Sequence, residues 1–110
     1  MKKIHILSES AAIGSRLRDI LYQAGYGDIV LSDLTAIPAE QTDEIIIVYA
    51  KSRIFDVIQS VESCGCPAIL LLNPDCYAMY IDRARHADIT LLLMPVAPFA
   101  LLDAVQGVIS

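Results

Sequence analysis

The sequence predicts an α/β fold in which one parallel β-sheet is covered by helices on both faces. Short apolar runs alternate with segments of helical periodicity along the chain, and this alternation is typical of right-handed βαβ units. The run Glu44–Tyr49 is rich in Ile and Val and apolar on both faces, as expected of a strand inside a parallel sheet. A chain of 110 residues suits a single domain, predicted over residues 1–110.

Five apolar runs are predicted to be strands. They are Ile4–Leu7, Ile29–Leu31, Glu44–Tyr49, Pro67–Leu72 and Ile89–Leu93. Five strands joined by helices favour the flavodoxin-like strand order 2-1-3-4-5. The predicted architecture is therefore a three-layer α/β/α sandwich.

Helical spacing of apolar residues marks the connections. The first helix carries Ile13, Leu17, Ile20, Leu21 and Ala24 and stops at Gly25. The helix after the third strand is expected to have Ser52 as its cap and Ile54, Phe55, Ile58 and Val61 as its inner stripe. The next has Asp75 as its cap and Tyr77, Tyr80, Ile81 and Ala84 on one face, and the last starts near Pro98 with Leu101, Leu102, Val105, Val108 and Ile109 inward.

The connection between Leu31 and Glu44 is the exception. Pro38 interrupts it and leaves little room for a helix. We expect the second helix to be one or two turns long, or missing.

Charge and hydropathy exclude several functions. With 8 Lys and Arg against 13 Asp and Glu, the net charge is −5, which disfavours nucleic-acid binding by these residues alone. No apolar run approaches the roughly 20 residues that cross a bilayer, and Ile4–Leu7 is too short for a signal-peptide core. We expect a cytoplasmic protein whose surplus apolar residues lie in buried strands or under a partner.

The cysteines give no sign of a disulfide framework or a metal site. There are three, and Cys64-Gly65-Cys66 has C-x-C spacing instead of the C-x-x-C of redox and zinc sites. We expect reduced cysteines packed as small apolar groups, with no cofactor and no metal.

Two segments resemble a known family. The stretch Lys3–Tyr26 looks like the opening of a bacterial response-regulator receiver domain (CheY-like), including its closing Ala24-Gly25-Tyr26. The stretch from Met94-Pro95 to Val105 looks like the receiver ending, in which Lys-Pro precedes the last helix. The resemblance covers essentially the whole chain and implies the receiver fold and a role in two-component signal transduction.

The resemblance also implies a phosphorylation site, and here the sequence departs from the pattern. Receivers have an acidic pair that holds Mg²⁺, a phosphoacceptor Asp, a Thr or Ser, and a Lys. The matching positions hold Ser8 and Glu9 for the acidic pair, Tyr49 (or Val48 in a shifted register) for the acceptor, Leu72 for the Thr or Ser, and Met94 for the Lys. The position of the switch aromatic holds Leu91. The chain therefore looks like a pseudo-receiver, with no catalytic residue.

The residues at these positions have ordinary structural interpretations as well. Glu9 is expected to be solvated near the first helix, or to be reached by a swinging Lys51 in place of a bound cation. Tyr49 is expected to anchor its loop. Asn73 is expected to be a turn residue before Pro74.

An apolar group late in the chain suggests an interaction face. Its members are Tyr77, Met79, Tyr80, Val96 and Phe99. In receivers the fourth helix, fifth strand and fifth helix form an output or dimer face, and the resemblance implies the same here. The alternative is ordinary core packing with a few exposed aromatic residues. Arg83 and Arg85 with Asp82 are expected either to form salt bridges across such a face or to be solvated.

The expected function is that of a non-enzymatic regulatory domain acting by protein–protein contact, through a protein partner or a homodimer. Because receivers join output domains after the last helix, we expect the N-terminal part of a longer regulator of transcription or antitermination. The segment Ser8–Gly14 is similar to the receiver-like domains of AmiR/NasR-type (ANTAR) antiterminators, in which nucleic acid would be bound only beyond residue 110. The alternatives are a stand-alone adaptor, a small-ligand sensor using the vacated pocket, and a working receiver with an unusual acceptor.

Overall fold

A computed structural model describes residues 3–109 and contains a five-stranded, all-parallel sheet in the order β2-β1-β3-β4-β5. The strands are β1 (Ile4–Ser8), β2 (Ile29–Ser32), β3 (Ile45–Tyr49), β4 (Ala68–Leu72) and β5 (Thr90–Leu93). The helices are α1 (Ala11–Gln23), α2 (Ile54–Cys64), α3 (Pro74–His86) and α4 (Pro98–Ile109). The predicted fold class and strand order are confirmed, and each predicted strand differs from the observed one by a single residue at one end.

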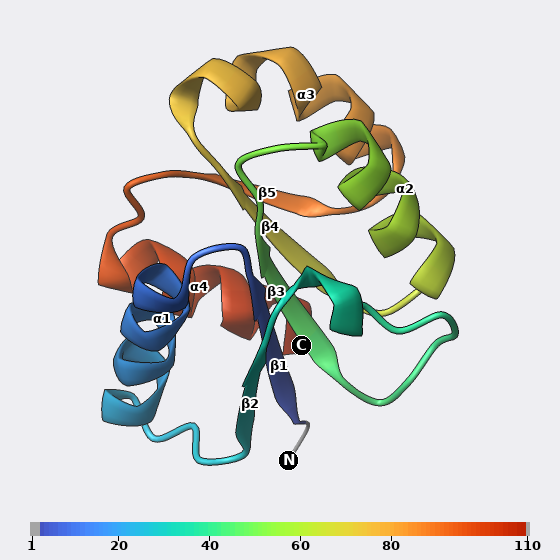
Figure 1. The fold of residues 1–110 in the computed structure, drawn as a ribbon. Helices are drawn as coiled ribbons and strands as arrows, with labels where there is room; N and C mark the ends of the chain where they lie inside the picture. Colours follow the sequence, from blue (N-terminus) through green and yellow to red (C-terminus); the bar gives the residue numbers. More distant parts are fainter. Residues whose placement is uncertain (1–2, 110) are drawn as a thin grey trace.

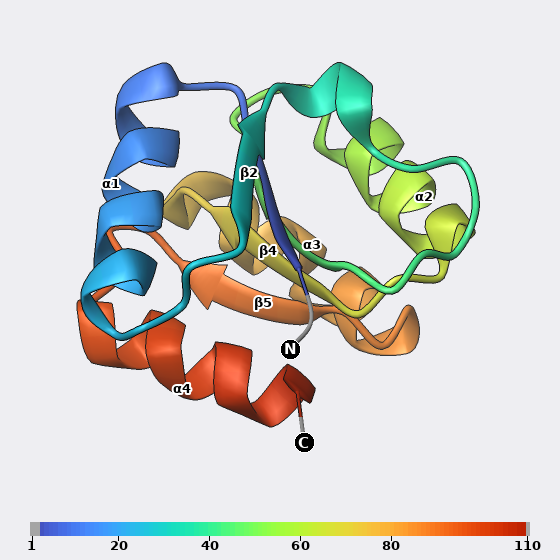
Figure 2. The same cartoon turned by 90° about the horizontal axis from the view of Figure 1, so that it is seen from below.

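The helices form two layers on opposite faces of the sheet (Figures 1 and 2). On one face Leu17 of α1 and Leu101 of α4 belong to one buried cluster. On the other face Ile58 of α2 and Ala84 of α3 belong to a second. This division gives the three layers of the predicted sandwich.

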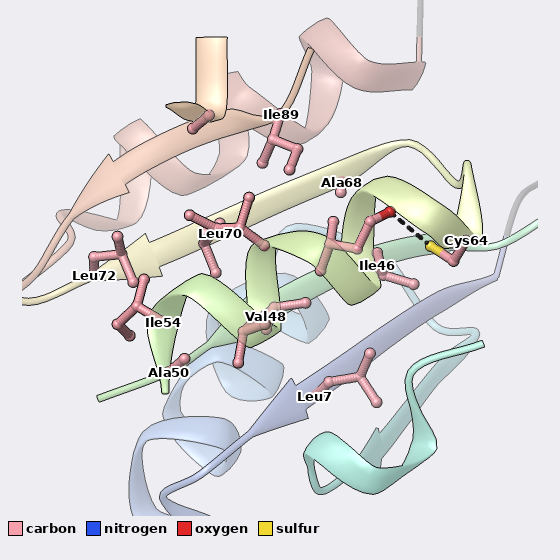
Figure 3. Close-up of a cluster of buried hydrophobic side chains, with 14 of the residues drawn as sticks. Leu7, Ile46, Val48, Ala50, Ile54, Cys64, Ala68, Leu70, Leu72 and Ile89 are labelled. Carbon is pink, nitrogen blue, oxygen red and sulfur yellow. Dashed lines mark hydrogen bonds between the residues drawn. The ribbon is translucent and has the colours of Figure 1, made fainter. Parts of the chain in front are cut away.

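The central strand β3 supplies both clusters. Ile46 and Val48 face α2 and α3, whereas Ile47 and Tyr49 face α1 and α4. Figure 3 shows Ile46 and Val48 beneath α2, beside Leu70 of β4. Because successive side chains of a strand point to opposite faces, a strand covered on both faces must be apolar throughout.

The connection between β2 and β3 contains only the 3₁₀ turn η1 (Leu34–Ala36), so the prediction of a short second helix is confirmed. Asp33 begins the turn and accepts hydrogen bonds from the backbone N–H of Thr35 at 2.9 Å and from its hydroxyl. Leu34, Ala36 and Ile37 are partly buried against the cluster beneath α2. This segment therefore covers part of the sheet where a helix would otherwise lie.

Helix ends follow the prediction in one place and contradict it in two. Gly25 adopts a left-handed φ of 98° just after α1 and terminates it. Ser52 is not the cap of α2, because Arg53 holds that position with a φ of 52°. Asp75 is not the cap of α3 either, because Asn73 precedes Pro74, which suits the first helical position.

Two residues expected on inner helical faces lie outside. Phe55 is 49% exposed, and Ile109 at the end of α4 is 43% exposed. The buried stripe of α2 contains Val57 in place of Phe55, because each residue turns the helix by about 100° and Phe55 falls outside the stripe. No described helix is both long enough and apolar enough to span a membrane.

Candidate functional site

The five positions that the receiver resemblance predicts for a phosphorylation site lie at one edge of the sheet. Ser8 is paired in register with Tyr49, and Leu72 with Leu93. The backbone N–H of Glu9 donates to the Tyr49 carbonyl at 3.1 Å, and that of Met94 donates to the Leu72 carbonyl at 2.9 Å. This is the carboxyl edge, where parallel α/β sheets bind their ligands.

Ser8 has a structural role in the loop after β1. Only 6% of it is exposed. Its hydroxyl donates to the Ser10 carbonyl at 2.7 Å and accepts from the Ser10 N–H at 3.1 Å. Ser10 in turn caps α1 by accepting from the Ile13 N–H at 3.2 Å. The Ser8 hydroxyl is therefore engaged in shaping the entry to α1.

Glu9 is bound by the chain itself. Its carboxylate accepts hydrogen bonds from the backbone N–H groups of Lys51 and Ser52, both at 3.1 Å, and from the Ser52 hydroxyl at 3.0 Å. The carboxylate is thus partly exposed, as expected, but it is held by two backbone donors that the sequence did not indicate, and the Lys51 side chain acts on it through its charge. Ser52 is unavailable as a helix cap for the same reason.

These contacts change the acidity of Glu9. Partial burial acts to raise the pKa of its carboxyl. The hydrogen bonds from Lys51 and Ser52 and the nearby Lys51 charge outweigh this, so the pKa lies below its ordinary value. The ionised carboxylate is therefore the form that this site stabilises.

The remaining three positions are filled by packed side chains. Tyr49 is 4% exposed and lies in the cluster shared with α1 and α4, against which Met94 is also packed. Leu72 is fully buried in the cluster on the opposite face. In place of the acceptor carboxylate and the ammonium group of receivers, this edge has an aromatic ring and a thioether.

Tyr49 and Asn73 form one polar contact at this edge. The Tyr49 hydroxyl lies 3.4 Å from Asn73 Oδ1 and 3.3 Å from Asn73 Nδ2. This contact links the end of β3 to the residue that precedes α3. Asn73 therefore contributes both the residue before α3 and a partner for the phenol, whereas anchoring of the loop after β3 by Tyr49 stays a prediction.

The predicted interaction face is only partly exposed. Met79 on α3 is 73% exposed and Phe99 on α4 is 76% exposed. Tyr77 and Tyr80 are half-buried against the cluster beneath α2 and α3. Val96 is only 8% exposed and belongs to the other cluster, so placing it on the interaction face was wrong. Val96 comes directly after Pro95, and its side chain packs inward in the cluster that includes Leu101 of α4.

The exposed pair flanks an edge strand. Met79 and Phe99 lie on helices that cover opposite faces of the sheet, and β5 forms the edge between those helices (Figure 1). Leu93 of β5 is itself 47% exposed. The described surface therefore offers three large apolar side chains from α3, β5 and α4.

The charged residues of α3 are used within the chain. Arg83 forms an ion pair with Glu62 of α2 at 2.8 Å, and its guanidinium lies 6.0 Å from the centre of the Phe55 ring. Arg85 lies 4.0 Å from Asp82 on the same helix. Arg83 thus joins α2 to α3, an intramolecular role that the sequence analysis did not foresee.

Sequence reasoning also missed a polar link that joins β1, β2 and the residue just before β3. His5 Nδ1 lies 3.0 Å from Glu44 Oε2, and His5 Nε2 lies 2.8 Å from Ser32 Oγ. The only signal in the sequence is a histidine within an apolar strand. This link stabilises the sheet on the face that η1 covers.

Two of the three cysteines lie away from the carboxyl edge of the sheet, whereas Cys76 lies in the first turn of α3, close to Asn73. Cys64 and Cys66 are buried at the end of α2 and Cys76 is half-buried, all as free thiols. Within residues 3–109 no three His, Cys, Asp or Glu side chains are grouped closely enough to hold a metal ion.

Comparisons with known proteins add no relative. A scan of protein-family models and searches of curated proteins and of solved structures each found no match to the chain.

Proposed function

We propose that the chain is a receiver-like regulatory domain that acts through contact with another protein and transfers no phosphoryl group. The observation that carries the proposal is the state of the carboxyl edge. Three of the five positions are filled by Tyr49, Leu72 and Met94, and the one remaining carboxylate, Glu9, is held by the backbone of residues 51 and 52.

The chemistry of phosphoryl transfer makes this observation relevant. Mg²⁺ is usually bound by one or two carboxylates together with phosphate oxygens. The charge that develops on the transferring group also needs a nearby cation. This edge has one carboxylate, which already accepts hydrogen bonds from the chain, and a methionine at the lysine position. It is therefore poorly suited to binding Mg²⁺ or to stabilising the charge of the transferring group.

The exposed apolar residues support action by contact. Met79 and Phe99 are the two most exposed of the large apolar side chains described. Exposed apolar residues on a rim of polar ones are typical of protein interaction sites. We place this interaction on α3, β5 and α4, as the receiver resemblance implies, and we place the protein in the cytoplasm because its three cysteines are free thiols.

The first test is a response to phosphoryl analogues. Addition of Mg²⁺ with beryllofluoride to ¹⁵N-labelled protein is expected to leave the amide signals of Glu9, Tyr49 and Asn73 unmoved. Acetyl phosphate is expected to leave the intact mass unchanged. A receiver with a complete acidic pair serves as the positive control. Saturable shifts around Glu9, or a mass gain of one phosphoryl group, would contradict the proposal.

The second test concerns the interaction face. Met79→Ala and Phe99→Ala are expected to weaken self-association measured by sedimentation, whereas Tyr22→Ala is not. Tyr22 is a suitable control because it is 46% exposed but lies on α1. Equal effects of all three substitutions, or a loss of stability without a change in association, would show that these side chains form no interface.

A further inference from the structure

A groove runs between η1 and α2. Two adjoining hollows of about 810 and 360 Å³ share the lining residues Leu34, Thr35, Ile37, Asp56 and Ser60. Leu34, Ile37 and Pro38 line one wall, and Asp56, Gln59 and Ser60 of α2 line the other. We refer to this feature as the η1–α2 groove. Figures 1 and 2 both show η1 beside α2.

The groove exists because one crossover lacks its helix. The connections β1–β2, β3–β4 and β4–β5 contain helices of 13, 11 and 13 residues, whereas β2–β3 contains a turn of three. A crossover between parallel strands usually supplies a helix that packs on the sheet beside its neighbours. Here α2 therefore has only a turn and a loop on its η1 side, and the half-buried Leu34 and Ile37 lie at the bottom of the gap.

The walls of the groove are acidic. The carboxylates that line it are Asp56 and Glu62 of α2, together with Glu9 from the loop after β1. Among the lining residues Arg53 is the single cation, and it lies at the start of α2. Glu62 is paired with Arg83 and Glu9 with backbone donors, so Asp56 is the central charge.

We propose that the η1–α2 groove binds a basic amphipathic α-helix of a partner protein. An apolar stripe on that helix would contact Leu34 and Ile37, and its Lys or Arg side chains would face Asp56. Helices that place an apolar face in a groove are a common mode of peptide recognition. Charge complementarity speeds such encounters and selects the partner. A second copy of the chain has a net charge of −5 and is disfavoured on an acidic wall.

This inference depends on the proposed function in one respect, namely that the domain works through a protein partner. The groove lies between η1 and α2, whereas the interaction face proposed above lies on α3, β5 and α4. The two proposals therefore fail separately: a response to beryllofluoride would contradict the proposed function without altering peptide binding to the groove.

The test uses a designed peptide and the whole chain labelled with ¹⁵N. The peptide has about 15 residues, because shorter helices are marginal in water, with Leu at helical i, i+3, i+4 and i+7 positions and Lys elsewhere. One control peptide replaces every Lys by Glu, and another scrambles the Leu and Lys order. We expect saturable amide shifts in residues 34–37 and 56–63 with the first peptide alone, together with a gain of helical circular dichroism.

A pair of charge-reversing variants locates the site. Asp56 and Asp75 both occupy the first turn of a helix, α2 and α3 respectively, and both are exposed. Asp56→Lys is expected to weaken binding about tenfold, since it reverses a charge next to the peptide. Asp75→Lys makes the same change in net charge and is expected to alter the affinity less than about twofold on the same scale. The unperturbed amide spectrum of each variant confirms its folding.

Four outcomes would overturn the inference. One is the absence of shifts along the groove, and another is their appearance around Met79 and Phe99 instead. A third is an equal loss of affinity in both variants, which would indicate attraction by net charge alone. The fourth is a set of groove shifts that depend on protein concentration without peptide, which would assign the groove to a second copy of the chain.

Discussion

The Glu9 carboxylate accepts hydrogen bonds from the Ser52 backbone N–H at 3.1 Å and from the Ser52 hydroxyl at 3.0 Å. Glu9 lies in the loop after β1 and Ser52 in the loop after β3, so this contact joins two neighbouring strand ends. Glu9 thus acts as a link within the chain.

Glu9→Gln is expected to lower the free energy of unfolding near neutral pH by about 1 kcal/mol, because a carboxylate accepts hydrogen bonds more strongly than an amide. The pKa of Glu9 is lowered in the folded state. Its contribution is therefore fully present above the ordinary value of about 4.3 and is lost as the pH falls through the lower folded pKa.

Urea unfolding of both proteins at about pH 7 and about pH 3 measures this effect. The difference between them should shrink at the lower pH. Glu40→Gln, an exposed loop substitution, serves as the control and should cost less than about 0.5 kcal/mol. A difference that grows on acidification would refute the assigned role of Glu9.

Gly14→Ala and Gly107→Ala are expected to change stability in opposite directions. A Cβ at Gly14 in α1 would lie 2.7 Å from Leu31 Cδ1 and 3.2 Å from Ser8 Cβ. The Leu31 methyl group can rotate away, but Ser8 belongs to β1, so α1 must shift. We expect a net loss of about 1 kcal/mol after the gain in helix propensity.

Gly107 in α4 has no neighbouring atom within 4 Å of an added Cβ. Alanine should therefore stabilise α4 by up to about 1 kcal/mol, because it has the higher helix propensity. Thermal unfolding of the two variants compares the effects directly. A rise in Tm for Gly14→Ala as large as that for Gly107→Ala would show that α1 is not packed closely on the sheet.

Tyr49→Asp is expected to destabilise the protein without restoring phosphorylation. Tyr49 is only 4% exposed, and placing a carboxylate there costs about 3 kcal/mol or more, from lost packing and burial of an unpaired charge. Met94 still leaves the lysine position uncharged. Acetyl phosphate should therefore add no phosphoryl group to the variant, as read by intact mass.

Tyr49→Phe is the matched control for that substitution. It keeps the ring and removes the hydroxyl contact with Asn73, whose distances of 3.3 and 3.4 Å indicate a weak bond. The expected cost is about 0.5 kcal/mol. Phosphorylation of Tyr49→Asp would instead reveal an edge that still supports the chemistry of a receiver.

Cys64 and Cys66 are expected to resist alkylation by iodoacetamide in the folded protein. Both are buried, with 1% and 7% of their surface exposed. Burial raises the pKa of the Cys64 thiol, and the Cys66 side chain raises it further despite an opposing backbone hydrogen bond. The thiolate is the reactive form, so labelling at neutral pH should be slow.

Cys76 is half-buried, and burial together with the charge of Asp75 raises the pKa of its thiol as well. It should be labelled slowly, and before the other two cysteines. Intact mass after a timed reaction counts the labels, and all three should react in denaturant. Rapid labelling of Cys64 or Cys66 in native conditions would contradict their burial.

Most of the fold could be predicted from local patterns. Runs such as Ile45–Tyr49 and Ala68–Leu72 are apolar at every position, which identifies strands that are covered on both faces. The position of Pro38 correctly indicated that the β2–β3 connection has room for only a short helical turn. Helix starts were less predictable: Ser52 and Asp75 both have the right chemistry for a cap, but Ser52 is bonded to Glu9 and α3 already begins at Pro74.

The candidate site was also predictable only in part. The absence of an acidic acceptor and of a lysine could be read from residue types alone, at Tyr49 and Met94. The partner of Glu9 could not, because residues 9 and 52 are brought together only when β1 and β3 pair. The burial of Val96 and the pairing of His5 with Ser32 and Glu44 depend on the same kind of long-range contact.

The sequence by itself determined the α/β class, the order of the elements and the apolar character of the strands, because hydrophobic periodicity and turn residues act over a few neighbouring positions. The tertiary structure decided which polar groups meet. Only packing placed the Glu9 carboxylate against two backbone donors, exposed Phe99 and buried Val96, and left a groove between η1 and α2. These outcomes depend on the relative placement of segments far apart in the chain, on which local patterns carry no information.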